Sequence, residues 1–337
     1  MLRLLRELAA RGWAVTVTAP GPGGVLEAAR AAGHGAEPLD LGGLEPGGGG
    51  PAVRAWPRAR ALAREADVVL LNGTVCGRAL PALRGLPARR VLSVHDVVER
   101  VPRMWRGADV VLAASGAVAH SLAPLSAHVV HAPVDPDPPE ADPPWDRAAG
   151  TGPVVGFVGR VEPRKAPLDL VRAAPDVRRG APGARIVVVG DDPYAADPAY
   201  AERVEREARA AGVERHGWVE NAPGLMRHLD VLVLPSRQEP FGTVLAEAMA
   251  VGTPVVATRV GGLAEVVDDG VTGRLVEPGD PAALGAAILD VLARRDEMGA
   301  AARERARRFH TRLYADRFEA LVGEGATAAA RDAGGVR

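Results

Sequence analysis

Short apolar runs of strand type recur along this chain, and each is followed by a loop and then by a helical stretch. Such runs occupy residues 67–71, 90–96, 154–160, 185–189 and 230–234. Strands that alternate with helices in this way are typical of parallel sheets covered by helices. The sequence therefore predicts an α/β fold with doubly wound sheets, which bind ligands beyond the carboxyl ends of their strands.

The length and the position of the proline residues predict two domains. The chain has 337 residues, of which 47% are hydrophobic, enough for two sizeable cores. Proline and aspartate crowd residues 133–153, a composition that is typical of a linker. We therefore predict a first domain, a Pro-rich linker, a second domain, a helix that crosses back to the first domain and a disordered tail, at residues 1–140, 141–152, 153–310, 311–322 and 323–337.

Charge and cysteine content bear on nucleic-acid binding, on disulfides and on the compartment of the protein. Lys and Arg total 41 and Asp and Glu total 42, so a net charge of -1 gives no general attraction to nucleic acid. The single cysteine, Cys76, excludes an internal disulfide and fits a reducing cytoplasm. Residues 1–8 are charged and helical in composition, which predicts that they are not a secretory leader. We expect a cytoplasmic protein.

Two carboxylates, Glu239 and Glu247, frame the most informative stretch, residues 235–256. Glu239 is expected on the loop that leaves the strand at 230–234, and Glu247 in the following helix. The amides of Phe241, Gly242 and Thr243 would begin that helix, where the helix dipole attracts a phosphate. An anion site between two carboxylates suits a ribose and a sugar joined by a diphosphate.

This stretch resembles the Glu-x7-Glu signature of glycosyltransferase family four, a group of retaining glycosyltransferases with the GT-B fold. The resemblance implies two Rossmann-like domains that face a cleft, with a nucleotide diphosphate sugar bound mainly by the second domain and a hydroxyl-bearing acceptor by the first. It also implies that no metal or cofactor is required. A UDP-sugar is the favoured donor, and the acceptor is not identified.

Other residues match the family pattern in the second domain. Arg160 and Lys165, the only lysine of the chain, stand where the family grips the donor diphosphate, although Ala166 replaces the usual glycine. Gly190 lies on a predicted cleft loop, and Gly261 and Gly262 form a Gly-rich loop that is expected near the phosphates.

The resemblance assigns roles to these residues. Glu247 would bind the ribose hydroxyls and Glu239 a hydroxyl of the transferred sugar. His95, at the end of the strand at 90–96, would bind the donor sugar near the reaction centre. Trp218 would stack on the base, or would be a core residue. The catalytic candidates are therefore His95, Arg160, Lys165 and Glu239, and the donor-binding candidates are Arg160, Lys165, Gly190, Trp218, Glu239, Phe241, Gly242, Thr243, Glu247, Gly261 and Gly262.

Two departures from the family keep other hypotheses open. Family members usually begin with a strand and a Gly-Gly loop before the helix that here occupies residues 2–11, and Ala132-Pro133 replaces an Asn-Gly pair. The first alternative is therefore a catalytically impaired or non-catalytic homologue that binds nucleotide sugars. The second is a nucleotide-sugar epimerase on the same fold.

A basic segment suggests a further contact. Arg100, Arg103 and Arg106 flank Met104 and Trp105. The segment could rest on a membrane surface or bind an anionic acceptor, or it could be a solvated face.

Overall fold

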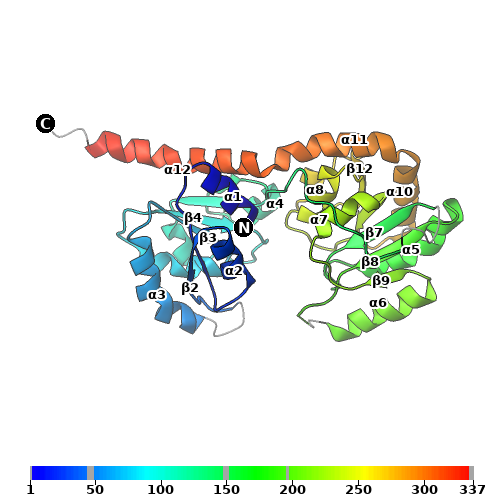
Figure 1. Cartoon of the computed structure of the whole chain (residues 1–337), viewed down its shortest axis with the longest axis horizontal. Helices are drawn as coiled ribbons and strands as arrows, with labels where there is room; N and C mark the ends of the chain where they lie inside the picture. The colour runs from blue at the N-terminus through cyan, green and yellow to red at the C-terminus, as the bar shows by residue number, and fades with distance from the viewer. Residues whose placement is uncertain (1, 44–48, 147–151, 195–196, 334–337) are drawn as a thin grey trace. The chain divides into compact units, whose positions relative to one another are not determined.

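The structure is a computed structural model that describes residues 2–43, 49–146, 152–194 and 197–333. The chain divides into two compact units. Unit 1 comprises Met1–Pro133 and Thr311–Arg337, and unit 2 comprises Val134–His310. Both are α/β units with parallel sheets, as the alternation of strands and helices predicts (Figure 1).

Unit 1 contains two parallel sheets among its described residues. Strand β1 (Thr16–Ala19) pairs with β2 (Gly35–Pro38). The second sheet has the order β3-β4-β5-β6, with bounds Val68–Asn72, Arg89–Val94, Val110–Ala113 and His128–Val129. In this sheet Asn72 lies opposite Ser93, so the loops that follow β3 and β4 begin at the same edge.

The helix expected over residues 2–11 is present in unit 1 as α1. Ser115 is the N-cap of α4, because its hydroxyl oxygen accepts the amide proton of Val118 at 3.1 Å. The helical elements are α1 (Leu2–Ala10), α2 (Gly24–Ala31), α3 (Gly49–Ala63), η1 (Val75–Leu83), η2 (Arg103–Gly107), α4 (Gly116–Ser121) and α12 (Thr311–Ala333).

The C-terminal helix α12 belongs to unit 1 and packs against α1 (Figure 1). Glu319 accepts one hydrogen bond from Trp13 Nε1 at 2.7 Å and another from Arg11 Nη1 at 2.8 Å. The helix continues to Ala333, although a disordered tail was predicted from residue 323. The alanine-rich sequence favours this continuation, since alanine is the strongest helix former. Residues 334–337 lie outside the described residues.

Unit 2 is built on one six-stranded parallel sheet with the order β12-β11-β10-β7-β8-β9. The four central strands β11, β10, β7 and β8 are almost entirely buried, because helices cover both faces of a doubly wound sheet. From β7 to β12 their bounds are Val154–Val158, Arg185–Val189, Glu214–His216, Val231–Leu234, Val255–Thr258 and Gly273–Val276.

The helices of unit 2 fall into two packed groups. Helix α5 packs against α6 and α10, whereas α8 packs against α11 and η3. The bounds are α5 (Pro167–Gly180), α6 (Pro198–Ala210), α7 (Ala222–Leu225), η3 (Met226–His228), α8 (Thr243–Ala250), α9 (Leu263–Val266), α10 (Pro281–Ala293), α11 (Arg295–Ala306) and η4 (Arg307–Phe309).

Residues 134–146, which include part of the linker predicted at 141–152, belong to unit 2. Trp145 is buried, with its ring 6.1 Å from that of His216. Asn221 Nδ2 donates to the carbonyl of Pro139 at 2.8 Å. The boundary between the units therefore falls after Pro133, ahead of the predicted linker at 141–152, and residues 147–151 lie outside the described residues.

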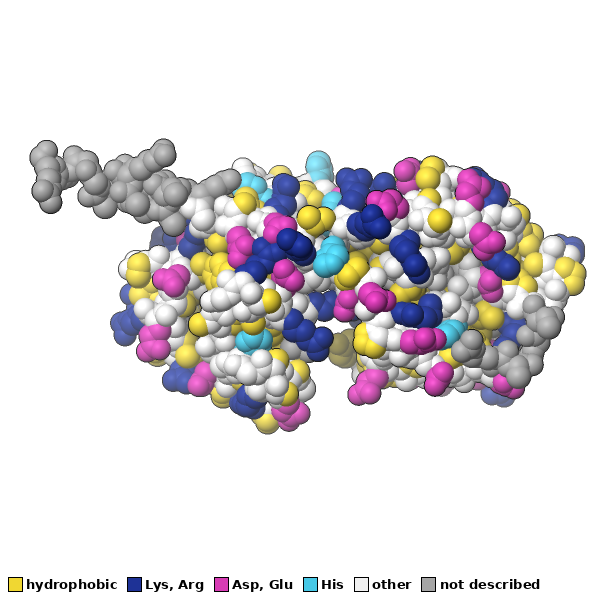
Figure 2. Space-filling view, turned by 45° about the horizontal axis from the view of Figure 1, so that its top comes forward, with side chains coloured by type: hydrophobic (Ala, Val, Ile, Leu, Met, Phe, Trp, Pro, Cys, Tyr) yellow, Lys and Arg dark blue, Asp and Glu magenta, His cyan; other side chains and the backbone are white. Residues whose placement is uncertain are grey.

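The visible surface mixes charges of both signs. Basic and acidic side chains are interspersed over the face that Figure 2 draws, in keeping with the net charge of -1. Within the described ranges, none of the helices has the length and hydropathy needed to cross a bilayer.

Candidate functional site

The order of strands in unit 2 defines a switch point between β7 and β10. These two strands are neighbours, but the chain continues from β7 to β8 on one side and from β10 to β11 on the other. Open α/β sheets bind ligands beyond the carboxyl ends of strands at such a point. The loop at 159–166 leaves β7, and the loop at 235–242 leaves β10.

Lys165 and Glu239 join these two loops. The Lys165 ammonium donates to Glu239 Oε2, and the side chains are only 13% and 9% exposed. The Ser236 hydroxyl donates to the same oxygen at 3.4 Å. A carboxylate buried to this extent requires a charged or hydrogen-bonding partner, and the only lysine of the chain supplies one.

Arginines fix the two loops to each other. The amide of Arg237 donates to the carbonyl of Arg164 at 2.8 Å, and Arg164 Nη1 donates to the carbonyl of Gln238 at 3.3 Å. The Arg237 guanidinium pairs with Asp169 at 2.8 Å. Asp169 lies in the first turn of α5 and is 5% exposed, and this burial raises its pKa while Arg237 opposes the rise. These contacts hold the two loops that carry Lys165 and Glu239 in fixed positions relative to each other.

Gly261 and Gly262 hold the backbone of Glu239. The amide of Gly262 donates to the carbonyl of Glu239 at 3.0 Å. A Cβ on Gly261 would lie 2.0 Å from that carbonyl oxygen, and its φ of +51° is also unfavourable for a side chain. These glycines were expected beside the phosphates, and their contact in the structure is with Glu239.

Helix α8 begins at Thr243, shortly after Glu239. Gly242 is its N-cap with a φ of +89°, and Phe241 is buried edge-on against Phe309 with ring centroids 5.4 Å apart. The amides of Thr243 and Val244 precede the first hydrogen bond of the helix, in which the Leu245 amide donates to the carbonyl of Gly242 at 2.9 Å. Glu247 lies half-buried in the same helix. The sequence order predicted from strand to loop to helix is confirmed in this stretch.

Arg160 lies on the loop after β7 with different partners from Lys165. Its Nη1 pairs with Glu162 at 3.1 Å, and its guanidinium lies 5.9 Å from the centre of the Tyr194 ring. Gly190 is pressed against this loop, because a Cβ there would lie 2.1 Å from the carbonyl oxygen of Gly159. The structure thus brings Lys165 and Glu239 into contact. Arg160 instead pairs with Glu162 and lies over the ring of Tyr194.

Trp218 is a surface residue. Its side chain is 70% exposed, and its amide donates to Asp191 Oδ2 at 2.9 Å. The alternative that Trp218 is a core residue is therefore wrong. Tyr194 is exposed as well, at 75%, so unit 2 presents this ring to solvent in addition to that of Trp218.

His95 belongs to unit 1, directly after β4. Its Nε2 lies 2.8 Å from Asn72 Oδ1 and 3.4 Å from Ser93 Oγ. Burial lowers the pKa of the half-buried ring, which favours neutral imidazole near pH 7.

The basic segment at 100–106 offers little apolar surface. Trp105 is 3% exposed and packs into the core of unit 1, where a Cβ on Gly77 would meet its Nε1 at 2.3 Å. Met104 is 41% exposed, and the three arginines are exposed. A membrane contact by this segment stays a prediction, with Met104 as the exposed large apolar side chain among residues 100–106.

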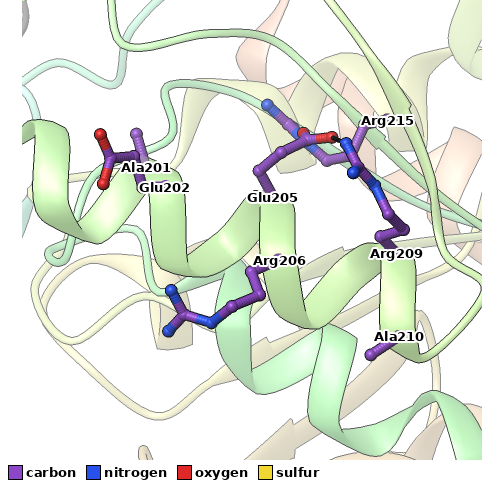
Figure 3. Close-up of a pocket in the computed structure, with 7 residues that line it drawn as sticks. All are labelled: Ala201, Glu202, Glu205, Arg206, Arg209, Ala210 and Arg215. Carbon is purple, nitrogen blue, oxygen red and sulfur yellow. Dashed lines mark hydrogen bonds and ion pairs between the residues drawn. The ribbon is translucent and has the colours of Figure 1, made fainter.

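A separate concavity runs along α6 and reaches Arg215 in β9 (Figure 3). Glu205 lies between two arginines there, at 3.4 Å from Arg209 and 3.6 Å from Arg215. Because these charges offset one another and the hollow is wide open, we do not assign a ligand to it.

Several supporting residues were not predicted from the sequence. Ser236, Arg237 and Asp169 support the Lys165–Glu239 pair through contacts across the switch point. Asn72 has a feature that points to the site: it is the last residue of β3, which is the neighbour of β4, the strand that precedes His95.

Comparisons with known proteins agree with this fold. Two protein-family models match, "Glycosyltransferase Family 4" at residues 1–138 and "Glycosyl transferases group 1" at residues 152–294. A glycogen synthase of Mycobacterium tuberculosis is 39% identical over 174 residues, which are 50% of this chain and 40% of that protein. A D-inositol 3-phosphate glycosyltransferase 2 of Catenulispora acidiphila is 42% identical over 168 residues, 46% and 39% of the two chains. The match thus spans about 40% of the length of these relatives.

Solved structures show the same fold over nearly the whole chain. Anabaena Alr3699/HepE, in complex with UDP and glucose, has a TM-score of 0.77 at 21% identity, with 96% of this chain and 95% of that chain covered. A sucrose-phosphate synthase of Thermosynechococcus elongatus has a TM-score of 0.76 at 24% identity, with 97% and 92% covered. The two Rossmann-like units thus form a GT-B fold, as predicted, and the chain belongs to the group 1 glycosyltransferases of family four.

Proposed function

We propose that this protein transfers a sugar from a nucleotide diphosphate sugar to an acceptor hydroxyl, with retention of the anomeric configuration. The observation that carries the proposal is the contact between Lys165 and Glu239 at the switch point, beside the first turn of α8. A cation, a carboxylate and the amides at the start of a helix are groups that suit a diphosphate linked to a sugar.

Lys165 is suited to the diphosphate because it can serve two partners at once. An ammonium group has three N–H donors, and the bond to Glu239 uses one of them. The other donors, together with the amides at the start of α8, would contact the phosphate oxygens. Negative charge grows on the diphosphate as the sugar leaves, so these groups would stabilise the transition state.

The two glutamates would bind the sugars on either side of the diphosphate. Glu239 would accept a hydrogen bond from a hydroxyl of the transferred sugar, and Glu247 would accept from the ribose hydroxyls. Arg160 would add a second cation at the loop after β7. Trp218 is offered as the stacking surface for the base, since its indole is exposed to solvent.

The proposed reaction exchanges one bond of the anomeric carbon for another. The bond from this carbon to the diphosphate oxygen breaks, and the acceptor oxygen bonds to the same face of the sugar. The acceptor proton passes to the departing diphosphate. His95 would bind a hydroxyl of the donor sugar, and the charge on the leaving group would be offset by this chain's own cations and amides.

UDP-glucose is the first donor to test, because HepE has been solved in complex with UDP and with UDP-glucose. Thermal unfolding would be followed with UDP-, GDP- and ADP-sugars in parallel. Ligand at about 100 times its Kd adds about 2.7 kcal/mol to the free energy of unfolding. One nucleotide series should raise the unfolding temperature, and no rise with any of them would contradict the proposal.

Product analysis then distinguishes the alternatives. A transferase should form a glycoside only when an acceptor is added, with the donor's anomeric configuration. A changed sugar in the absence of acceptor would indicate an epimerase. Binding without turnover across acceptor classes would indicate a non-catalytic homologue.

A further inference from the structure

His95 is the candidate site residue that unit 1 supplies, and its ring is held by neighbours from two adjacent strands. Strands β3 and β4 are parallel, and Asn72 at the end of β3 lies opposite Ser93. The amide of Gly73 donates to the carbonyl of Ser93 at 2.8 Å, which ties the two strand ends together. The side chain of Asn72 can therefore reach the ring of His95 across the sheet edge.

One ring nitrogen faces both neighbours. Nε2 lies 2.8 Å from Asn72 Oδ1 and 3.4 Å from Ser93 Oγ. A carbonyl oxygen can only accept, so Nε2 must carry the proton in this arrangement. No hydrogen bond to Nδ1 occurs among the described residues. In a neutral imidazole the second nitrogen is then an acceptor.

A third element supports the same arrangement. Tyr314 on α12 is buried, and its hydroxyl is hydrogen-bonded with the Ser93 side chain. Ser93 is itself only 3% exposed. Helix α12 thus helps to fix the Ser93 side chain, whose Oγ lies 3.4 Å from His95 Nε2.

We propose that Asn72 is a positioning residue that holds His95 as the Nε2–H tautomer, so that Nδ1 accepts a hydrogen bond from a substrate hydroxyl. The identity of that hydroxyl as one of the donor sugar rests on the proposed function. The tautomer itself does not, because it is a property of unit 1 without substrate.

The test is the tautomer of His95 measured by nuclear magnetic resonance on the full chain labelled with 15N-histidine. The missing signal of a His95→Gln variant assigns the ring. In the unsubstituted protein, above the pKa of His95, Nδ1 should show the shift of an unprotonated nitrogen and Nε2 that of a protonated one. A ring protonated at Nδ1 would overturn the proposal.

Two substitutions of Asn72 separate positioning from folding. Asn72→Asp keeps an acceptor opposite Nε2 and should keep the tautomer. Asn72→Leu has similar volume but no acceptor, and should give a mixture of tautomers. Asp96→Asn, which changes an exposed neighbour of the ring, is the matched control and should leave the tautomer unchanged. An unchanged tautomer in a folded Asn72→Leu variant would overturn the role of Asn72.

An activity measurement adds an independent arm. With an active donor, Asn72→Leu should lower kcat/KM by about tenfold, the factor that corresponds to one neutral hydrogen bond. Asn72→Asp should recover most of this loss. If no donor is turned over, the proposed function fails while the tautomer measurement still decides the role of Asn72.

Discussion

Substitution of Lys165 should affect stability and activity through two separable effects. Lys165→Met leaves Glu239, whose side chain is 9% exposed, without its charged partner. Removal of one member of a buried ion pair costs about 3–5 kcal/mol, because the remaining charge stays desolvated. The Ser236 hydroxyl retains one hydrogen bond to the carboxylate, which favours the lower end of this range.

A double-mutant cycle isolates the pair. Glu239→Gln removes the charge, so the double variant Lys165→Met/Glu239→Gln should be more stable than Lys165→Met alone. The coupling energy should be about 1–3 kcal/mol, as for groups in direct contact. The matched control is the pair Arg172 and Glu207 in the same unit, with side chains 48% and 31% exposed, where coupling should be about 0.2–1 kcal/mol.

The assay must report on unit 2 by itself, because a chain of two units need not unfold in one step. Hydrogen exchange of the amides in β7 and β10 under increasing urea would serve, since these strands adjoin the pair. In the same variants, kcat should fall by about 10²–10³ with Lys165→Met and should not recover in the double variant. A coupling as small as that of the surface pair, or near-normal kcat, would refute the reasoning.

Three further substitutions test other parts of the account. Gly261→Ala should lower kcat by more than tenfold and destabilise unit 2 by about 1–3 kcal/mol, because its Cβ would collide with the carbonyl of Glu239. Glu247→Gln should mainly weaken nucleotide binding, so an unchanged Kd in calorimetry would count against its ribose role. Burial lowers the pKa of His95 from its usual 6.5. As the pH falls, the unfolded state is therefore protonated at a higher pH than the folded state. Stability should therefore drop below about pH 6.5, by at most about 1.4 kcal/mol per pH unit, and His95→Gln should remove this part of the pH dependence in urea titrations.

The alternation of strands and helices was enough to predict the fold class, because the buried runs and helical stretches have distinct periodicities. The segment around Glu239 and Lys165 was also identified from sequence, since both residues lie on loops after strands. Strand order was not predicted, although it is this order that makes β7 and β10 neighbours and brings Lys165 to Glu239.

Other features depend on contacts that local sequence does not record. In the sequence, Asp169 looks like an ordinary acidic residue in the first turn of a helix. Only the fold shows that it is buried and paired with Arg237. Trp105 looked like part of an amphipathic basic segment, but the fold places it in the core. Conversely Trp218, for which a core position was an open alternative, is exposed.

The most direct test of the central claim is an experimental structure of this chain with bound UDP. The account predicts diphosphate oxygens within hydrogen-bond distance of Lys165 Nζ and the first-turn amides of α8, with the ribose hydroxyls at Glu247. A nucleotide bound in the concavity along α6, or a diphosphate that contacts neither Lys165 nor the start of α8, would contradict it.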